Sequence, residues 1–396
     1  MVATEVDVPG EGVPKELDGD ELSEIRLAVR RFVRERLIPH EAQVEDEDEV
    51  PEALVEEMKA LGLFGLSIPE SYGGLGLGLE EQVGVYEELG YTSPAFRSVF
   101  GTNVGIGSLG ILLDGTESQR QAYLPRLATG ELVGSFALTE PDVGSDAAAV
   151  RTRAREDGDS YVLDGTKRYI TNAARAGVFT VMARTGSPAS RGDGVTAFAV
   201  DAHLPGIEIG APERKMGQRG AKVCDVIFDG VRVPKSSIIG GVPGQGFKTA
   251  MKTLDVGRLH VAALCVGAMQ RALDEAARFA QTREQFGRPI AEFQLIQAML
   301  ADSSTELLAA KTMVRATAAR FDRGKAPSAD ASRCKLFATE ALGRVADRAV
   351  QIHGGAGYIA DYAVERIYRD ARLFRLYEGT SQIQQLIIAR DVLSPG

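Results

Sequence analysis

Hydrophobic residues recur at helical spacing in the first third of the chain. After Asp20, apolar side chains follow one another mostly at intervals of three or four residues up to Val33, which is the period of a helix with one buried face. Asp20 is a suitable N-cap for this helix and Pro39 a suitable end. Three further segments show the same pattern between glycine-rich turns and are expected to be helices: 54–63, 79–89 and 118–128.

The spacing of hydrophobic residues changes to two between Val133 and Ile239. Runs rich in β-branched and apolar residues at 178–183 and 195–200 are typical of strands. We therefore expect a small antiparallel β-domain in this region. Two Asp-Gly pairs stand between apolar residues, where such pairs predict hairpin turns: Asp164 with Gly165, and Asp229 with Gly230.

Long helical segments follow from Gly244 to near the end of the chain. Helices of such length that are apolar on more than one side indicate a bundle that also buries surface against other subunits. Together with the preceding parts, they predict the α+β class. The three longest predicted helices are 247–282, 290–323 and 328–352.

Composition and charge restrict the class of protein. The chain has 396 residues, which is more than one hydrophobic core usually fills, so two or three subdomains are expected. Its apolar fraction of 44% and charged fraction of 25% are ordinary for a globular protein. The net charge of −10 argues against nucleic-acid binding, which needs a basic surface to displace counterions.

The three cysteines, Cys224, Cys265 and Cys334, lie far apart and form no CxxC pair. They are expected to be buried or inert thiols in a reducing compartment, and they predict no metal site. No apolar run approaches the ~20 residues that a transmembrane helix needs. The acidic N-terminus resembles neither a transit peptide nor a signal peptide. We therefore expect a cytoplasmic protein without a membrane span.

One carboxylate near the C-terminus is a candidate general base. Glu378 follows a mostly apolar approach and directly precedes Gly379, and Ser381 with Gln384 forms a capping-box pair that would open a helix over 383–393. Neighbouring aromatic and aliphatic side chains would keep the carboxylate partly dry, which would raise its pKa toward the range of a general base. A solvated loop glutamate fits the same stretch equally well.

Five motifs extend the pattern beyond this loop: FALTEPDVGSD at 136–146, KRYITN at 167–172, REQFG at 283–287 with Gln294, QIHGGAGY at 351–358, and RDARLFRLYEGTSQIQ at 369–384. In sequence and order they resemble the motifs of the acyl-CoA dehydrogenases, and the resemblance runs from about residue 22 to residue 393. It implies that family's fold, with a central antiparallel β-domain and a C-terminal four-helix bundle. The expected parts are a disordered tail at 1–20, an N-terminal helical domain at 21–130, the β-domain at 131–240 and the helical bundle at 241–396.

The resemblance implies a reaction and a base. Members of the family remove the α-proton of an acyl-CoA thioester and pass the β-hydrogen as hydride to FAD, leaving a trans-2-enoyl-CoA. Glu378 matches the base, and its backbone N–H is an expected donor to the thioester carbonyl, where negative charge develops. Gly379 lets the backbone approach the thioester. Some branches carry the base on the helix after the β-domain, where this chain has Gly257, which cannot serve.

The resemblance also implies contacts to FAD. Phe136 stands where the family often has tyrosine, and Tyr169 where it often has tryptophan, so stacking is retained while a hydroxyl is lost at 136. The residues expected around the flavin are Phe136, Leu138, Thr139, Tyr169 and Thr171, with Thr380 and Gln382 as further contacts. Those expected to hold the adenine and pyrophosphate, partly in a neighbouring subunit, are Arg283, Gln285, Phe286, Gln294, Gln351 and Gly355.

For the substrate, the resemblance places Ser145 near the pantetheine arm of CoA and Asp255 with Arg258 toward the CoA end of a tunnel. Tyr377 is expected to face the acyl group, and its size suggests a short or medium chain. Arg97 lies near a position where the dicarboxylyl-CoA branch binds a distal carboxylate. The C-terminal motif does not look like that branch, and a surface arginine is the other interpretation.

The implied partners are an electron-transferring flavoprotein and three further copies of the chain, arranged as a tetramer of paired dimers. Three alternatives remain. An acyl-CoA oxidase would use dioxygen, but such chains are usually much longer. A non-catalytic or half-active subunit of a hetero-oligomer would be expected to lose the base or the flavin residues. The nitroalkane-oxidising branch uses aspartate as its base.

Overall fold

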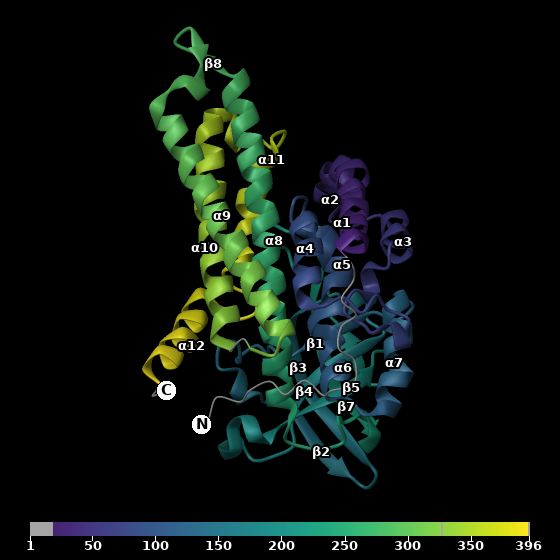
Figure 1. The fold of residues 1–396 in the computed structure, drawn as a ribbon. Helices are drawn as coiled ribbons and strands as arrows, with labels where there is room; N and C mark the ends of the chain where they lie inside the picture. Colours follow the sequence, from purple (N-terminus) through teal and green to yellow (C-terminus); the bar gives the residue numbers. More distant parts are fainter. Residues whose placement is uncertain (1–18, 326–327, 395–396) are drawn as a thin grey trace.

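The computed structural model describes residues 19–325 and 328–394 and has three parts (Figure 1). Helices from the first third of the chain lie beside the long helices of the last third, and a sheet lies at the lower end of the picture. This mixture of helices and sheet confirms the predicted α+β class. Most of the tail predicted at 1–20 falls outside the described residues. Asp20 is already inside the first helix, so the prediction that it caps the helix was wrong.

The N-terminal part is helical, and the helices predicted at 54–63, 79–89 and 118–128 form to within three residues of those bounds. Helix α5 was not predicted because all of its residues are buried and no polar face marks it. Pro39 lies in a 3-10 turn rather than ending a helix in open loop. The helices are α1 (Gly19–Phe32), α2 (Glu41–Glu47), α3 (Glu52–Ala60), α4 (Leu79–Leu89), α5 (Pro94–Thr102), α6 (Leu109–Asp114) and α7 (Glu117–Thr129).

The sheet follows α7 and has the strand order β1-β4-β2-β3-β7-β6, with β5 paired to β4. Two of its ladders are parallel, those of β4 with β1 and, at a single residue pair, of β4 with β2. The others are antiparallel, including that of β4 with β5. The two strands predicted at 178–183 and 195–200 are β4 and β5. The strands are β1 (Gly134–Ala137), β2 (Arg153–Asp157), β3 (Ser160–Thr171), β4 (Val178–Arg184), β5 (Val195–Asp201), β6 (Ile207–Ile209) and β7 (Val223–Pro234).

Neither predicted Asp-Gly hairpin forms. Both pairs lie inside the two longest strands, β3 and β7, which pair with each other and shift register between Leu163 and Gly165. Across this shift the carboxylate of Asp164 accepts a hydrogen bond from the N–H of Gly230 at 2.8 Å. The turn-forming residues therefore build a bulge in a continuous pair of strands. The turn between β2 and β3 is at 158–159 instead.

The last part is a helical bundle around α8, a helix of 37 residues that is about 55 Å long. A two-stranded hairpin joins α8 to α9 at one end of the bundle, which Figure 1 shows to be the end away from the sheet. The elements are α8 (Gly246–Thr282), β8 (Glu284–Gln285), β9 (Arg288–Pro289), α9 (Gln294–Asp322), α10 (Ser328–His353), α11 (Ala363–Phe374) and α12 (Ser381–Leu393).

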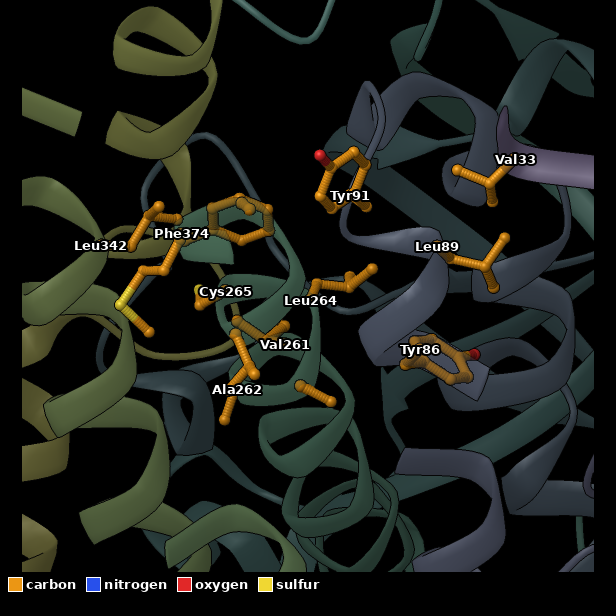
Figure 2. Close-up of a cluster of buried hydrophobic side chains, with 14 of the residues drawn as sticks. Val33, Tyr86, Leu89, Tyr91, Val261, Ala262, Leu264, Cys265, Leu342 and Phe374 are labelled. Carbon is orange, nitrogen blue, oxygen red and sulfur yellow. The ribbon is translucent and has the colours of Figure 1, made fainter. Parts of the chain in front are cut away.

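One hydrophobic core joins the N-terminal helices to the bundle. In Figure 2, Leu89 of α4 lies next to Val33, and Leu264 of α8 lies beside α4. Leu342 of α10 and Phe374 of α11 pack on the opposite side of α8. Full burial of one such side chain contributes about 1.5–3 kcal/mol. Because Phe374 is anchored here, the loop that follows α11 starts from a fixed point.

Two sequence expectations about membranes and thiols can be compared with the structure. The three cysteines are buried and free, as predicted. One described segment, Pro94–Asp114, is long and apolar enough to cross a membrane by length and composition alone, so the prediction that no apolar stretch approaches this length was wrong. Of its most apolar stretch, 83% is buried inside the protein, and buried core helices meet the same criterion.

Candidate active site

Glu378 lies in the short loop between α11 and α12. It has a φ of 53°, and Gly379 has a φ of 89°. The left-handed conformation is uncommon for a residue with a side chain, so the surrounding structure must hold it. Among the described residues, none accepts a hydrogen bond from the backbone N–H of Glu378. That N–H is therefore free to bind a substrate oxygen.

Side chains from two helices hold the carbonyl groups of this loop. Lys335 of α10 donates its ammonium to the carbonyl oxygen of Gly379 at 2.7 Å. The side-chain amide of Gln384, on α12, donates to the carbonyl oxygens of Glu378 at 3.2 Å and Gly379 at 2.9 Å. Lys335 and Gln384 are both fully buried. Together they fix the two peptide units that follow the candidate base.

The predicted capping box is wrong in detail. The N-cap of α12 is Thr380, whose hydroxyl accepts a hydrogen bond from the N–H of Ile383 at 3.3 Å. Ser381 is already helical and donates its hydroxyl to Glu340 at 2.6 Å. Gln384 reaches back beyond the cap to the base loop, as described above. A threonine directly before the serine explains the one-residue error, since both side chains can cap.

The carboxylate of Glu378 points at α8. Its Oε2 atom is buried and has no hydrogen-bond partner among the residues that the structure describes. A Cβ atom added to Gly257 would lie 2.2 Å from this oxygen, so the absence of a side chain at 257 makes room for the carboxylate. Gly257 is the position where the sequence resemblance places the base of other branches. The two possible positions of the base, 257 and 378, therefore lie next to each other in the structure, and only position 378 supplies a carboxylate.

Three cations from three helices act on this carboxylate. Burial is the largest influence and raises the pKa of Glu378, whereas the positive charges of Arg97, Lys335 and Arg258 lower it. The net pKa is raised above its ordinary value. A buried carboxylate with an unpaired oxygen and a raised pKa is what a general base requires.

Arg97, on α5, is buried, with 7% of its surface exposed, so the interpretation as a surface arginine is wrong. Its guanidinium lies over the ring of Tyr86, 5.1 Å from the centroid, and its Nε has no partner. Gly101, one turn later, leaves space for the side chain, since a Cβ there would meet Nε at 2.2 Å. No ion pair to Arg97 forms within the described part of the chain. A buried, unpaired cation is costly unless a ligand completes it.

A second polar group stands beside Arg97. Tyr86 stacks on His260 of α8, with ring centroids 4.3 Å apart. His260 Nε2 lies 2.9 Å from Oε1 of Gln82, whose amide nitrogen is used by the carbonyl of Leu77, so Nε2 is the donor. Burial lowers the pKa of His260 to about 3, which keeps it neutral. Within the described part of the chain, neither its Nδ1 nor the Tyr86 hydroxyl has a hydrogen-bond partner, so both are available to a polar group on a ligand.

The two residues predicted to contact CoA form a buried pair. Arg258 bonds Asp255 at 2.5 Å, and Ser328 of α10 donates to the same carboxylate oxygen at 2.7 Å. Burial, the largest influence, raises the pKa of Asp255. Both side chains are almost fully covered, and Arg258 also acts on Glu378. Their contact with CoA remains a prediction.

The residues predicted around the flavin ring gather where β1 and β3 come into contact. Phe136 and Leu138 are buried, Thr139 accepts a hydrogen bond at its carbonyl from the N–H of Arg168 at 2.8 Å, and Thr171 ends β3. Tyr169 is 60% exposed and has a φ of 58°. An exposed aromatic ring in a rare backbone conformation beside apolar residues suits a planar ring system.

The residues predicted for the adenine and pyrophosphate lie elsewhere. Figure 1 shows the β8 hairpin at the end of the bundle away from the sheet. Along α8, Arg283 is about 39 Å from Gly257, and Phe286 beside it is 93% exposed. One chain therefore does not bring the two sets together. The members of this distant set are all exposed: Arg283, Gln285, Phe286, Gln294, Gln351 and Gly355.

The remaining predicted residues are placed around the base loop or at the surface. Ser145 is exposed in the turn that follows β1, and Gln382 is exposed on α12. Thr380 is the N-cap of α12, where its hydroxyl accepts a hydrogen bond from the backbone. Tyr377 packs edge-on against Phe374, with centroids 5.8 Å apart, and burial raises its pKa.

Sequence reasoning missed two side chains that shape the site, Lys335 and His260. Lys335 lies on the face of α10 that also carries Ala331, Ala338 and Leu342, all buried. A lysine at helical spacing from core residues was therefore a detectable signal. His260 offered no such signal, because its helix is buried on nearly every side.

Comparison with known families covers nearly the whole chain. Models of the acyl-CoA dehydrogenase N-terminal, middle and C-terminal domains match residues 19–131, 135–231 and 244–393 respectively. A curated relative, the 3-(aryl)acrylate reductase of Clostridium sporogenes, is 43% identical over 93% of this chain and 97% of its own length.

A subunit of the caffeyl-CoA reductase–Etf complex of Acetobacterium woodii is 42% identical over 93% of this chain and 97% of its own length. Among solved structures, butyryl-CoA dehydrogenase from Megasphaera elsdenii is 33% identical, with a TM-score of 0.91 over 95% of this chain and 98% of that one.

Proposed function

The chain belongs to the acyl-CoA dehydrogenase family of oxidoreductases, and we propose from this that it oxidises the Cα–Cβ bond of an acyl-CoA thioester to the trans-2-enoyl-CoA. One observation carries the proposal: a buried carboxylate oxygen of Glu378 without a partner, facing the space that Gly257 leaves open.

Glu378 removes the α-proton of the bound thioester. Negative charge then develops on the thioester oxygen. The free backbone N–H of Glu378, the same residue as the base, donates a hydrogen bond to this oxygen. Gly379 leaves the approach to this N–H open. The apolar and aromatic side chains around the loop exclude water, which strengthens both the base and the hydrogen bond.

The residues present suit FAD as the cofactor. Phe136, Leu138, Thr139, Tyr169 and Thr171 would hold its ring system where β1 meets β3. When bound there, FAD would supply the acceptor for the hydride that leaves the β-carbon. The exposed set around Arg283 and Phe286 is too far along α8 to serve the same molecule within one chain, so we assign it to the FAD of a neighbouring copy. This assignment makes the enzyme an oligomer, and we propose the homotetramer.

The acceptor of the electrons is proposed to be an electron-transferring flavoprotein, since a relative that is 42% identical belongs to a complex with Etf. The cytoplasmic location and the domain boundaries inferred from the sequence remain predictions.

A second candidate is the reverse reaction, the reduction of a 2-enoyl thioester. Two relatives are named as reductases, and the raised pKa of Glu378 favours the protonated form that would deliver a proton to the α-carbon. The same residue would serve in both directions.

An anaerobic titration with saturated acyl-CoAs of graded length and branching tests the proposal. Bleaching of the bound flavin by one of them is expected and would identify the substrate class. A flavin that is bleached only by an external reductant and reoxidised by an enoyl-CoA would favour the second candidate. Bound flavin that responds to no thioester in either direction would contradict both.

A further inference from the structure

Lys335 is a buried cation whose position the reaction chemistry above does not explain. It is fully buried on α10, and its only hydrogen bond within the described residues goes to the carbonyl oxygen of Gly379, at 2.7 Å. No carboxylate forms an ion pair with it in this part of the chain. A lysine that only filled the core would be replaceable by methionine, which carries no desolvation cost.

The neighbours of Lys335 give its charge a target. The carboxylate of Glu378 is the strongest influence that favours its charged form, while burial lowers its pKa to about 8. The ammonium is therefore charged through the neutral range, in which Glu378 has to lose its proton in order to act. The charged or titratable groups that act on Lys335 are Glu378, Cys265, Arg258 and Glu340. Those that interact with Glu378 are Arg97, Lys335, Arg258, Tyr86 and Tyr377.

The geometry of the loop gives Lys335 a second role. Glu378 and Gly379 both have positive φ, a conformation that a residue with a side chain adopts only when it is held. Gln384 bonds both carbonyls from α12, and Lys335 bonds the second from α10. The carboxylate and the free N–H of Glu378 thus depend on two clamps, only one of which is charged.

We propose that Lys335 is a positioning residue of the loop that carries Glu378: its ammonium holds the carbonyl of Gly379, which orients the Glu378 carboxylate, and its charge adds to those of Arg97 and Arg258 in favouring the ionised carboxylate. This proposal rests on the role proposed for Glu378. It predicts that removing the charge changes the pH dependence of turnover as well as its rate, without changing the binding of the thioester.

The test compares the pH profile of kcat in wild type and Lys335→Met. Activity rises with pH as Glu378 ionises, so loss of the nearby positive charge should move this acidic limb to higher pH. The loss in kcat is expected to be on the order of tenfold at neutral pH, within the range of general-base effects. It should grow toward acid pH and shrink toward alkaline pH, with KM nearly unchanged.

Two further variants separate the roles. Lys335→Gln keeps a hydrogen-bond donor without charge, so it should recover part of kcat at alkaline pH but leave the limb displaced; it also replaces Lys335→Met if that variant does not fold. Arg271→Met is the control, because Arg271 is also a buried cation of the bundle, but its partners are Glu41 and Glu275. Each of these carboxylates keeps a second arginine as a partner when Arg271 is replaced. Arg271→Met should leave the limb where it is in wild type.

An acidic limb in Lys335→Met and Lys335→Gln that coincides with that of an active wild type would overturn the role of Lys335 and leave the proposed function intact. If no thioester reacts with wild type, unfolding free energies decide instead. Lys335→Met should lower the unfolding free energy of wild type more than that of Glu378→Gln. In the Glu378→Gln background the ammonium of Lys335 has no Glu378 carboxylate to stabilise, so its removal costs less. Equal destabilisation in the two backgrounds would also overturn the proposal.

Discussion

Two buried glutamates show how differently the β-domain and the helical bundle treat a charge. Glu140, just after β1, accepts hydrogen bonds from the N–H groups of Arg151 and Thr152 at 2.7 and 2.8 Å, from the Thr152 hydroxyl at 2.6 Å and from Lys167 at 2.7 Å. Glu378 has a buried oxygen to which no described residue donates a hydrogen bond. One carboxylate is saturated by the protein, and the other is left incomplete.

The pKa shifts of the two groups run in opposite directions. Burial raises the pKa of both, but for Glu140 the charge of Lys167 and the hydrogen bonds outweigh burial, and the net pKa is lowered. For Glu378, three cations do not outweigh burial. Ionisation of Glu140 therefore stabilises the folded state, whereas ionisation of Glu378 destabilises it. This difference agrees with a structural role for Glu140 and with the role proposed for Glu378 in the reaction.

The largest expected effect is that of replacing Glu378, the glutamate whose hydrogen bonding is incomplete. Glu378→Gln should retain the fold and a bound flavin but reduce the rate of flavin reduction by acyl-CoA by about 10²–10⁴-fold, the usual cost of losing a positioned general base. Stopped-flow absorbance under anaerobic conditions measures it. Reduction at more than about a hundredth of the wild-type rate would place the base elsewhere.

Replacing Glu140, the glutamate whose carboxylate accepts several hydrogen bonds, should mainly lower the free energy of unfolding. Glu140→Gln leaves Lys167 as an uncompensated buried charge, so unfolding free energy should fall by about 3–5 kcal/mol. Denaturant unfolding of the flavin-loaded protein measures this. The double variant Glu140→Gln, Lys167→Met should recover part of the loss, because it removes the stranded charge. A loss below about 1 kcal/mol would mean that the pair is not a structural element.

Arg97 is a second unsaturated group, and a distal carboxylate on the substrate would complete it. Arg97→Ala should weaken use of glutaryl-CoA about 10–150-fold more in kcat/KM than use of butyryl-CoA, equivalent to about 1.5–3 kcal/mol for a hydrogen bond to a charged group. The loss that both thioesters share reflects the positive charge removed from beside Glu378. Arg97→Met restores most of the volume and separates the charge from the cavity. Equal losses with both thioesters would exclude this role.

The smallest expected effect is a pH dependence of stability with opposite sign for the two glutamates. Glu378 has a raised pKa in the folded state, so its contribution is present below its unfolded pKa and is lost as pH rises through the folded value. Glu378→Gln should therefore gain stability over wild type as pH rises.

Glu140 has a lowered pKa in the folded state, so its contribution is present above its unfolded pKa and is lost as pH falls through the folded value. Glu140→Gln should accordingly approach wild-type stability toward acid pH. Melting temperatures of both variants across pH measure the two trends. Parallel trends would contradict the comparison.

The sequence predicted this contrast only in part. The position of Glu378 beside Gly379 and the order of the motifs predicted the loop that carries the proposed base, and helical spacing located α4 and α8 nearly to the residue. Local patterns failed where the outcome depends on distant partners. Asp164 lies in a strand because Gly230 pairs with it across the sheet, and no local turn preference contains that information.

The same limit applies to Arg97. As a single charged residue in an apolar segment it resembles a surface side chain, and only the packing of α5 among its neighbours buries it. Likewise, nothing near Gly257 in the sequence indicates that Glu378, more than a hundred residues later, would occupy the space beside it.

Gly257 on helix α8 lies beside the chain's own proposed base, and the C-terminal end of the helix leads to residues that, as proposed, bind the FAD of a neighbouring copy. This end of α8 is called the tip. A substitution at the tip would then leave its own chain's base intact and disable another copy. Two differently damaged chains, one altered at Glu378 and one at Arg283, would each be inactive alone. Co-expressed, they would form some mixed assemblies with an undamaged site, so two defective alleles could complement each other while one defective allele could impair a normal one.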